Sequence, residues 1–456
     1  MSRPRICVVG GGLAGMAAAL ACADAGAEVT LVERRRRLGG ATWSFRHNDL
    51  WFDNGQHVFM RCCTAYRAFL ERLGVADRVR LQSRLDVPVI APGGRISRLR
   101  RSRLLPAPAH LGRSLLTYRH LRIRDRLRLG PAALALRRVD VDAAETDQQT
   151  FGAWLTRHRQ SPAARDALWD LICRPTVNLP ATEASLALAA MVFQTGVLTD
   201  AGAADIGWAS VPLGELHGEA GGRALEAAGV EVLAGAAVTA VDGPPSGGPG
   251  FVVSVAATQR AADAVVVAVP HTAVADVVPE LAVAAGVGER LGVSPIVNVH
   301  VVYDRPVTDL ELAAGVGTDV QFVFDRTAGA GLEQGQYLAA SLSAADSYME
   351  RPSDDVKAAV VDSLSELFPR ARAARVVDTL VSREPAATFR GGPGSAGARP
   401  QAETSVPGLV LAGAWTATGW PATMEGAVRS GNTAARHALL AAGQSRKLPS
   451  TAEVPG

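Results

Sequence analysis

The chain has very little lysine and little cysteine. Of its 47 basic residues only Lys357 and Lys447 are lysines, so arginine carries almost all the positive charge. The five cysteines include the adjacent Cys62 and Cys63, but they form no CxxC pair and show no metal-ligand spacing. We therefore expect no bound metal, no disulfides, and a reducing cytoplasmic compartment.

Long apolar runs are also missing. No stretch of about 18 uninterrupted apolar residues occurs, which predicts no transmembrane helix. The apolar N-terminus does not read as a secretory signal, because glycines interrupt it and a strand follows in phase. With 456 residues, 48% of them hydrophobic, the chain can bury more than one core, which favours two domains.

The clearest motif lies at the start of the chain, in "ICVVGGGLAGMAAALACADAGAEVTLVE". A short β-branched run precedes Gly10, Gly12 and Gly15, which stand at GxGxxG spacing before an alanine-rich helix. Such a turn lets backbone and helix N-terminus approach a pyrophosphate. Glu33 ends the next strand, where an acid accepts ribose hydroxyls. The segment predicts a dinucleotide site.

Three further stretches decide which dinucleotide binds. "RRRRLGG" places Gly39 and Gly40 shortly after Glu33, where a loop can pass close to the cofactor, and "ADAVVVAVPH" at 262–271 reads as a strand returning to the cofactor domain. In "GLVLAGAWTATGWPATMEGAVRSG" at 408–431, a strand and loop precede a helix whose N-terminus can stabilise a reduced flavin. Together they indicate FAD.

The sequence resembles the hydroxysqualene dehydroxylases, also called squalene-associated FAD-dependent desaturases, within the amine-oxidase and phytoene-desaturase superfamily. The matching stretches run from near residue 6 to residue 431: "VVGGGLAGMAAA", "FDNGQHVFM", "LWDLICRPTVNLPATEASLALAAMVF", "ADIGWASVPLGEL", "REPAATF" and "LAGAWTATGWPATMEGAVRSG". The dinucleotide stretches are generic to the superfamily. "FDNGQH", the "CRPTVNLP" segment and "PATMEGAVRSG" point to the subfamily.

The resemblance implies an α/β protein, with a Rossmann-like FAD-binding domain and an inserted α+β substrate domain. We expect the FAD domain at 1–60, 216–274 and 375–440, the substrate domain at 61–215 and 275–374, and a flexible tail at 441–456. Residues 151–195 read as two helices around a turn at Pro175 to Pro180, with apolar inner faces that serve either as core or as a tunnel for a C30 hydrocarbon.

The expected cofactor-binding residues come from all these motifs. They are Gly10, Gly12, Leu13, Ala14, Gly15, Glu33, Arg34, Gly39, Gly40, Asn54, Gly55, Gln56, His57, Val238, Gly413, Ala414, Thr416, Thr423, Met424 and Glu425. One position departs from the superfamily. Where many members have an aspartate that holds the ribityl chain, this sequence has Ala414, so another group, such as the Thr416 hydroxyl, would supply that contact.

The implied reaction is the reductive loss of an allylic hydroxyl, from hydroxysqualene to squalene, in squalene and hopanoid biosynthesis. An acid must protonate the leaving hydroxyl. In "FDNGQH", His57 is the leading candidate, with Asp53 as its orienting carboxylate or as the alternative acid. Equally, Asp53, Asn54, Gln56 and His57 could only pin the loop to the cofactor. No second dinucleotide motif is found, so the electron donor is external and unidentified.

Arginines and leucines alternate in "RISRLRRSRLLPAPAHLGRSLLTYRHLRIRDRLRLG" at 95–130, where Asp125 is the one acid. In a helix, this pattern places apolar residues beside a basic face, which suits an anionic membrane surface. A solvated helix is the alternative. Nucleic acid is not expected, because no aromatic stacking series accompanies the charge. We expect a peripheral protein on the inner face of the plasma membrane.

Three rival functions stay open. A carotenoid desaturase would run the flavin chemistry in the opposite direction with the same fold. An amine oxidase would want an aromatic cage and a lysine near the flavin, and both lysines are poorly placed for it. A non-catalytic, FAD-stabilised membrane scaffold is the third.

Overall fold

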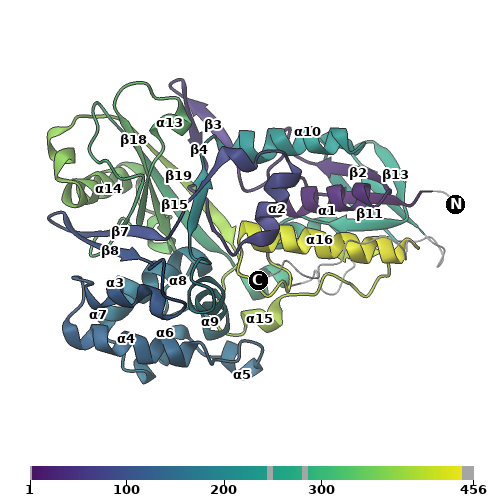
Figure 1. Ribbon diagram of the computed structural model, residues 1–456. Coiled ribbons are helices and arrows are strands. Elements are labelled where there is room, and N and C mark those ends of the chain that lie inside the picture. Colours follow the sequence, from purple (N-terminus) through teal and green to yellow (C-terminus); the bar gives the residue numbers. More distant parts are fainter. Residues whose placement is uncertain (1–2, 244–249, 280–285, 444–456) are drawn as a thin grey trace.

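A parallel five-stranded sheet forms the centre of one half of the molecule (Figure 1). The computed structural model describes residues 3–243, 250–279 and 286–443, so the expected tail lies almost wholly outside the described residues. All neighbouring strands pair in parallel, so their carboxyl ends meet at one edge. In spatial order the strands are β10 (Glu231–Ala234), β2 (Glu28–Glu33), β1 (Arg5–Val9), β14 (Ala264–Val267) and β20 (Leu409–Leu411).

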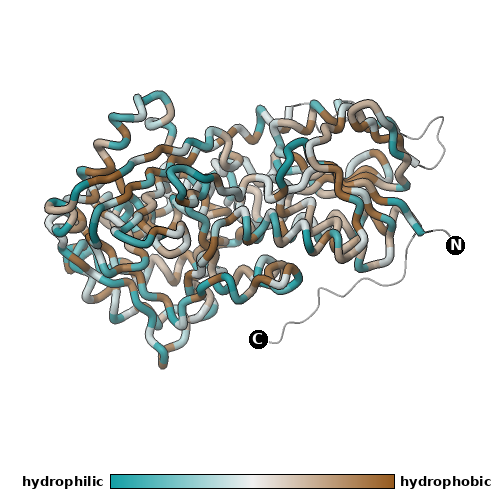
Figure 2. Tube along the Cα trace, turned by 90° about the horizontal axis from the view of Figure 1, so that it is seen from above, coloured by the Kyte–Doolittle hydropathy of each residue, from teal (hydrophilic) through white to brown (hydrophobic). Residues whose placement is uncertain are grey.

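The two faces of this sheet bury alternate residues of β1. Ile6 and Val8 pack under the helices, whereas Cys7 and Val9 face a three-stranded antiparallel sheet. Figure 2 shows these hydrophobic strands enclosed in the middle of this half. The covering elements are α1 (Leu13–Asp24), α2 (Thr64–Arg72), α10 (Ala220–Ala227), α11 (Val274–Val277), α12 (Val287–Leu291), α15 (Ser395–Ala398), α16 (Met424–Ala441), β11 (Val238–Asp242), β12 (Phe251–Val255) and β13 (Thr258–Ala262).

Helices α1 and α16 pack closely because a glycine stands at their crossing. A Cβ added at Gly431 would lie 2.2 Å from the Ala14 carbonyl oxygen, so only glycine fits there. The two ends of the chain are thereby joined into one domain. This explains why both terminal motifs belong to one site.

The second half is built on a mixed seven-stranded sheet, with α14 packed on one face (Figure 1). The strands, in spatial order, are β19 (Val376–Thr388), β15 (Ser294–Tyr303), β18 (Gln336–Ser343), β17 (Phe322–Asp325), β16 (Leu312–Gly315), β7 (Asp86–Ala91) and β8 (Arg95–Arg100). Smaller elements are α13 (Thr327–Ala330), α14 (Ser353–Leu367), the hairpin β3 (Ser44–His47) with β4 (Leu50–Asp53), and the sheet of β5 (Val58–Met60), β9 (Ile206–Ala209) and β6 (Val79–Leu81).

Strand β19 corrects the expected domain boundary at 375. Its residues pair along the length of β15, so 376–388 lies in the seven-stranded sheet and not with the cofactor half. β19 is an edge strand and only half buried. Its sequence therefore lacks the continuous apolar run that marks a central strand. The cofactor half resumes only after β19.

A helical lobe covers the lower part of the second half (Figure 1). The expected turn at 175–180 starts later, because Pro175 lies inside the last turn of the helix Asp170–Val177, which is followed by Asn178 in the left-handed conformation, φ 57°. The helical segments Pro162–Ala164, Arg165–Trp169 and Asp170–Val177 follow one another without a break, so there are three helical stretches between 151 and 198 rather than two. The helices are α3 (Gly112–Leu116), α4 (Ile123–Leu136), α5 (Ala144–Asp147), α6 (Phe151–Arg157), α7 (Pro162–Ala164), α8 (Asp170–Val177) and α9 (Leu186–Phe193).

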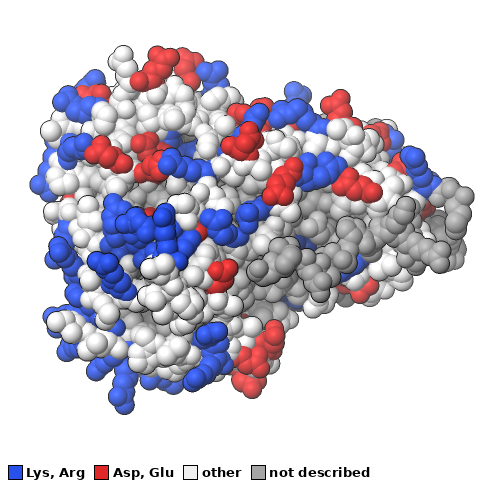
Figure 3. Space-filling model, in the orientation of Figure 1, with Lys and Arg blue, Asp and Glu red and all other residues white. Residues whose placement is uncertain are grey.

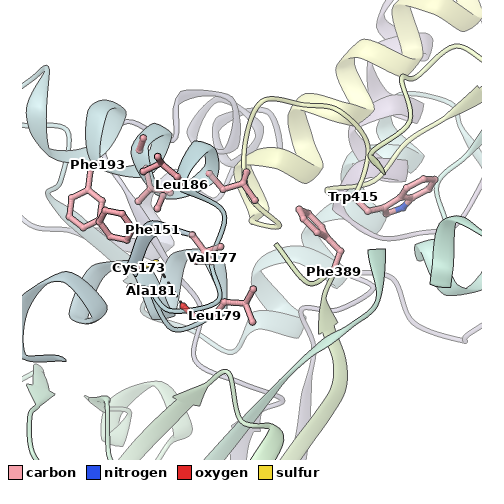
Figure 4. Close-up of a cluster of buried hydrophobic side chains, with 14 of the residues drawn as sticks. Phe151, Cys173, Val177, Leu179, Ala181, Leu186, Phe193, Phe389 and Trp415 are labelled. Carbon is pink, nitrogen blue, oxygen red and sulfur yellow. Dashed lines mark hydrogen bonds between the residues drawn. The ribbon is translucent and has the colours of Figure 1, made fainter. Parts of the chain in front are cut away.

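The apolar side chains of this lobe form a packed core. Phe151, Trp154, Trp169 and Phe193 are buried and their rings contact one another. The same cluster reaches the cofactor half through Phe389 and Trp415 (Figure 4). Within the described residues, no helix is long and apolar enough to span a bilayer. The predicted fold class, a dinucleotide-binding α/β domain with an inserted α+β domain, is confirmed.

Candidate cofactor and active site

The glycine-rich turn adopts the geometry that the motif predicts. Gly10 has φ 111°, and a Cβ there would lie 2.5 Å from the Ala268 carbonyl oxygen. A Cβ at Gly15 would lie 1.8 Å from the Gly10 oxygen, so both positions require glycine. Helix α1 begins at Leu13, and no side chain caps its N-terminus. The N–H groups of Leu13 and Ala14 therefore have no partner within the helix and suit an anion.

A second glycine pair closes over this turn. Gly40, with φ 58°, approaches so closely that a Cβ would lie 2.8 Å from the Gly12 Cα, and the Gly39 N–H donates to the Gly11 carbonyl at 2.9 Å. The expected cofactor residues on both glycine loops are thus brought together. The glycines at these positions carry no side chains, so their backbone can approach a pyrophosphate closely.

Glu33 is buried at the carboxyl end of β2 and is fixed by backbone groups. Its two carboxylate oxygens accept the N–H of Gly11 at 2.6 Å and of Arg35 at 2.8 Å. Each oxygen keeps a further lone pair, which can accept a ribose hydroxyl. Arg34, by contrast, is exposed on the outer side of the loop. Val238 begins β11 and packs partly against the apolar cluster beneath it.

The loop after β20 lies at the same sheet edge. The Gly413 N–H donates to the Ser430 hydroxyl of α16 at 2.8 Å, and the buried Thr416 hydroxyl donates to the Gly413 carbonyl at 3.0 Å. The Thr416 proton is therefore already used, and this hydroxyl could offer a ribityl chain only its lone pair. Ala414 has no polar side chain, as its sequence implied.

The buried Arg399, which sequence reasoning missed, holds this loop. Its Nη2 donates to the Ala414 carbonyl at 3.0 Å and to the Thr418 hydroxyl at 2.8 Å, and its guanidinium stacks on Phe389 at 4.9 Å. Burial lowers the pKa of Arg399 to about 10, and its Nε has no hydrogen-bond partner among the described residues. Among the described residues this cation has no carboxylate within 4.0 Å, although the charge of Asp147 raises its pKa, and it holds the loop that is expected to face the flavin.

Helix α16 begins where that loop ends. The Thr423 hydroxyl accepts the Gly426 N–H at 3.2 Å, so Thr423 caps the helix and Met424 is its first residue. The buried Glu425 carboxylate turns away to the start of α2, where it accepts the N–H groups of Ala65 and Tyr66. Its side chain joins two helices, and a cofactor contact would come from its backbone.

The "FDNGQH" loop is held by the seven-stranded sheet. The buried Asn54 side-chain amide donates to Glu384 Oε1 at 2.8 Å, and the Asn54 backbone carbonyl accepts the Ser382 hydroxyl of β19 at 2.8 Å. Gln56 donates its N–H to Asn298 Oδ1 of β15 at 3.4 Å. A Cβ at Gly55 would lie 2.7 Å from Asn298 Nδ2, which explains the glycine.

His57 ends this loop and is partly buried. Its Nδ1 lies 2.9 Å from the Gly55 carbonyl oxygen. Because a carbonyl only accepts, Nδ1 carries the proton, and Nε2 of the neutral ring is an acceptor. Burial lowers the pKa of His57, opposed by the Gly55 hydrogen bond and by the charges of Asp53 and Glu384. The neutral form is therefore favoured near pH 7.

The structure corrects the expected pairing of Asp53 with His57. The buried Asp53 carboxylate accepts the Ser44 hydroxyl at 2.6 Å, the Leu213 N–H at 2.9 Å and Arg326 Nη2 at 3.0 Å. It is the centre of a structural network joining distant segments. Sequence reasoning missed Arg326, which lies 273 residues from Asp53, and the ring of His57 is oriented by the Gly55 carbonyl instead.

A cavity of about 700 Å³ opens where the glycine loop meets β19. It is lined by three arginines of the glycine loop and by Trp43, Arg383 and Glu384. Arg37 stacks on Trp43 at 4.4 Å and donates to the Gly40 carbonyl, so the cavity borders the second glycine pair. Glu384 is the acidic side chain of this lining. It belongs to the "REPAATF" stretch, where an acid within a shared motif was an available signal.

These residues fit an adenine dinucleotide. Uncapped helix N–H groups, closely approaching glycines and a backbone-fixed acid converge at the carboxyl edge of β1 and β2, beside β14, where the strand order reverses. The fold and site define the class of flavin-binding oxidoreductases with a dinucleotide-binding sheet.

Comparison with known proteins identifies the family. The model of the family "Flavin containing amine oxidoreductase" matches residues 13–439, and the chain belongs to this family. Among curated relatives, zeta-carotene desaturase of Solanum lycopersicum is 27% identical, over 95% of this chain and 80% of that protein. Hydroxysqualene dehydroxylase of Rhodopseudomonas palustris is 27% identical, over 96% of this chain and 98% of that protein.

A solved structure of a putrescine oxidase double mutant shares the fold. Its TM-score is 0.70 at 21% identity, with 96% of this chain and 99% of that chain covered. The protein is thus an FAD-dependent oxidoreductase, as the sequence predicted. The relatives are also consistent with an isoprenoid-type substrate.

Proposed function

We propose that this protein removes the allylic hydroxyl of hydroxysqualene reductively and releases squalene. The observation that carries the proposal is the match to a hydroxysqualene dehydroxylase, which spans nearly the whole of both chains, 96% and 98%. Lys357, the one lysine among the described residues, pairs with Asp354 on the first turn of α14, which leaves amine chemistry without support.

The reaction breaks a carbon–oxygen bond and forms a carbon–hydrogen bond. When bound in reduced form, FAD supplies the hydride that the allylic carbon accepts. The hydroxyl leaves with one proton as water. The chain must therefore provide a proton at the leaving oxygen and an apolar wall that excludes competing water.

Two groups can handle this proton, His57 at the end of the "FDNGQH" loop and Glu384 in the cavity lining. His57 would have to be charged to donate it, and burial lowers the pKa of His57, which disfavours the charged ring. Glu384 lines the cavity, and one of its oxygens already accepts the Asn54 amide. We infer that Glu384, either directly or by holding charge on His57, takes part in proton delivery. Asp53 is left to its structural network.

The test is anaerobic single-turnover reoxidation of the dithionite-reduced protein by hydroxysqualene, followed at the flavin absorbance with the product identified by mass. We expect squalene from the wild type. Loss of the proton donor should slow this step about 10² to 10⁴-fold. The informative variants are His57→Gln and Glu384→Gln, each checked for an unchanged flavin spectrum.

The outcomes separate the candidates. A slow Glu384→Gln variant beside a nearly normal His57→Gln variant assigns the proton to Glu384. Two slow variants assign it to His57 with Glu384 holding its charge, and a normal Glu384→Gln variant excludes Glu384 from proton delivery. If the wild-type protein fails to turn over hydroxysqualene, the proposal is wrong. The second candidate, a carotenoid desaturase, draws support from the match to the tomato zeta-carotene desaturase. It predicts a substrate that loses two hydrogens, with the oxidised flavin bleached.

A further inference from the structure

Exposed apolar side chains are concentrated in one part of the helical lobe. Among the described residues, twelve large hydrophobic side chains are exposed, and seven of them lie between residues 96 and 134. Six of these form what we call the outer leucine patch: Leu104, Leu105, Leu116, Ile123, Leu127 and Leu134, with exposed fractions from 48% to 92%. Such a concentration of apolar side chains on a solvent-exposed surface marks an interaction site.

Helix α4 carries apolar residues on two opposite sides. Leu129, Ala132 and Leu136 are buried against the lobe. Ile123 and Leu127, together with Leu134 of the patch, stand at spacings of four and seven residues, so they share the side that faces away from the lobe. Figure 1 shows α4 at the outer margin of the lobe. Packing within this chain therefore does not explain the outward stripe.

Arginines flank this stripe on both sides. Arg124 and Arg128 follow the stripe residues by one position, and Arg122 and Arg126 precede them by one. Arg126 Nη1 also donates to the Leu116 carbonyl at 2.9 Å, which fixes the end of α3 beside the start of α4. An apolar stripe with cationic margins is the pattern of a helix that lies in a membrane interface.

The charge on this surface is lopsided. Residues 95–138 contain 13 arginines and one acid, a formal charge of +12, whereas the whole chain carries +3 and the remainder therefore −9. The exposed arginines at 103, 113, 119, 122, 124 and 128 have no carboxylate within 4.0 Å among the described residues. In Figure 3 the lower left of the molecule, where the helical lobe lies, shows blue and white with red confined to its right margin.

We propose that the outer leucine patch docks this protein on an anionic lipid bilayer. Basic residues near an anionic surface attract it, and the leucines can enter the boundary of the acyl region. Two copies would bring the same positive surfaces together, which disfavours self-association. A membrane-resident isoprenoid of the proposed function would give the enzyme a reason to dock, but the docking stands on the surface alone and is tested without substrate.

The test is sedimentation of the FAD-loaded protein with vesicles. In 50 mM NaCl we expect binding to vesicles of equal phosphatidylglycerol and phosphatidylcholine, release by 500 mM NaCl, and little binding to phosphatidylcholine alone. Arg124→Gln/Arg128→Gln should weaken binding about fivefold per arginine. Ile123→Gln/Leu127→Gln should weaken it at least about tenfold, because each buried methylene contributes to binding.

A matched control keeps the result specific. Val377 and Leu440 are also exposed apolar residues, but they lie on β19 and α16, away from the lobe. Val377→Gln/Leu440→Gln should bind as the wild type does, and all variants should keep the wild-type flavin spectrum. Equal binding to neutral vesicles, or equal loss in the patch and control variants, would overturn the proposal. So would retention on double-stranded DNA without vesicle binding, or a dimer that the patch variant abolishes.

Discussion

The edge of the cofactor sheet and the surface of the helical lobe differ in how they are built to bind a ligand. At the sheet edge, glycines without side chains let two backbone segments come into direct contact, as where Gly40 approaches Gly12. On the lobe, long side chains extend outward, as at Leu104, which is 92% exposed. The first surface suits one rigid, charged ligand, and the second suits a soft, extended one. Each of the following changes probes that contrast.

The largest effect is expected at the glycine turn. Gly12→Asp should abolish FAD binding, because a carboxylate about 4 Å from the pyrophosphate adds about 4 kcal/mol of repulsion, or about a thousandfold in affinity. Gly112→Asp, at a position with open space on α3, is the control. Flavin absorbance of the purified proteins measures retention. If the purified Gly12→Asp protein is yellow, the pyrophosphate does not bind at this turn.

A smaller loss is expected from breaking the buried Asp53 network. Arg326→Met leaves the Asp53 carboxylate buried and unpaired, which should lower the free energy of unfolding by about 3 to 5 kcal/mol. The exposed pair of Arg5 with Asp263 is the comparison, and Arg5→Met should cost at most about 1 kcal/mol.

Urea titrations measure both, and the double change Asp53→Asn/Arg326→Met should cost less than Arg326→Met alone. If Arg326→Met and Arg5→Met lower the free energy of unfolding equally, the buried Asp53 network does not stabilise the fold.

Acidification tests one buried histidine in each half. Burial lowers the pKa of both His217, beside Tyr66, and His300, beside Tyr337, to about 3. The unfolded chain takes up these protons below about pH 6.5 and the folded chain does not, so stability falls as the pH drops. Each should cost about 2 kcal/mol at pH 5 relative to pH 7.

The urea midpoint at the two pH values measures this loss. His300→Gln should flatten the dependence on pH by about half of the two-histidine contribution, and an unchanged slope would show that the ring is protonated in the folded state.

The smallest effect concerns a glycine outside the cofactor site. Gly130 lies in α4 with open space around it, so Gly130→Ala should raise the free energy of unfolding by about 0.5 to 1 kcal/mol. Gly15→Ala should do the reverse, because its Cβ would overlap the Gly10 carbonyl. Thermal unfolding of both variants measures the difference between a glycine that a close backbone contact requires and a glycine that no contact requires. Destabilisation by Gly130→Ala would contradict it.

The sequence alone predicted the dinucleotide turn, the acid that ends β2, the FAD cofactor and the fold class. These depend on local backbone geometry, where a glycine at a fixed spacing has few structural alternatives. The sequence also predicted that the two ends of the chain belong to one domain, because the motifs at both ends bind the same ligand.

Only the tertiary structure decided which side chains meet across the chain. Asp53 was expected to orient His57, yet its partners come from Ser44, Leu213 and Arg326. The alternation of leucine and arginine at 95–130 predicted a two-sided segment, but which leucines face outward depended on where α3 and α4 pack. Backbone conformation is set by neighbours in sequence, whereas the partner of a buried charge and the exposure of an apolar side chain depend on segments that only the fold brings together.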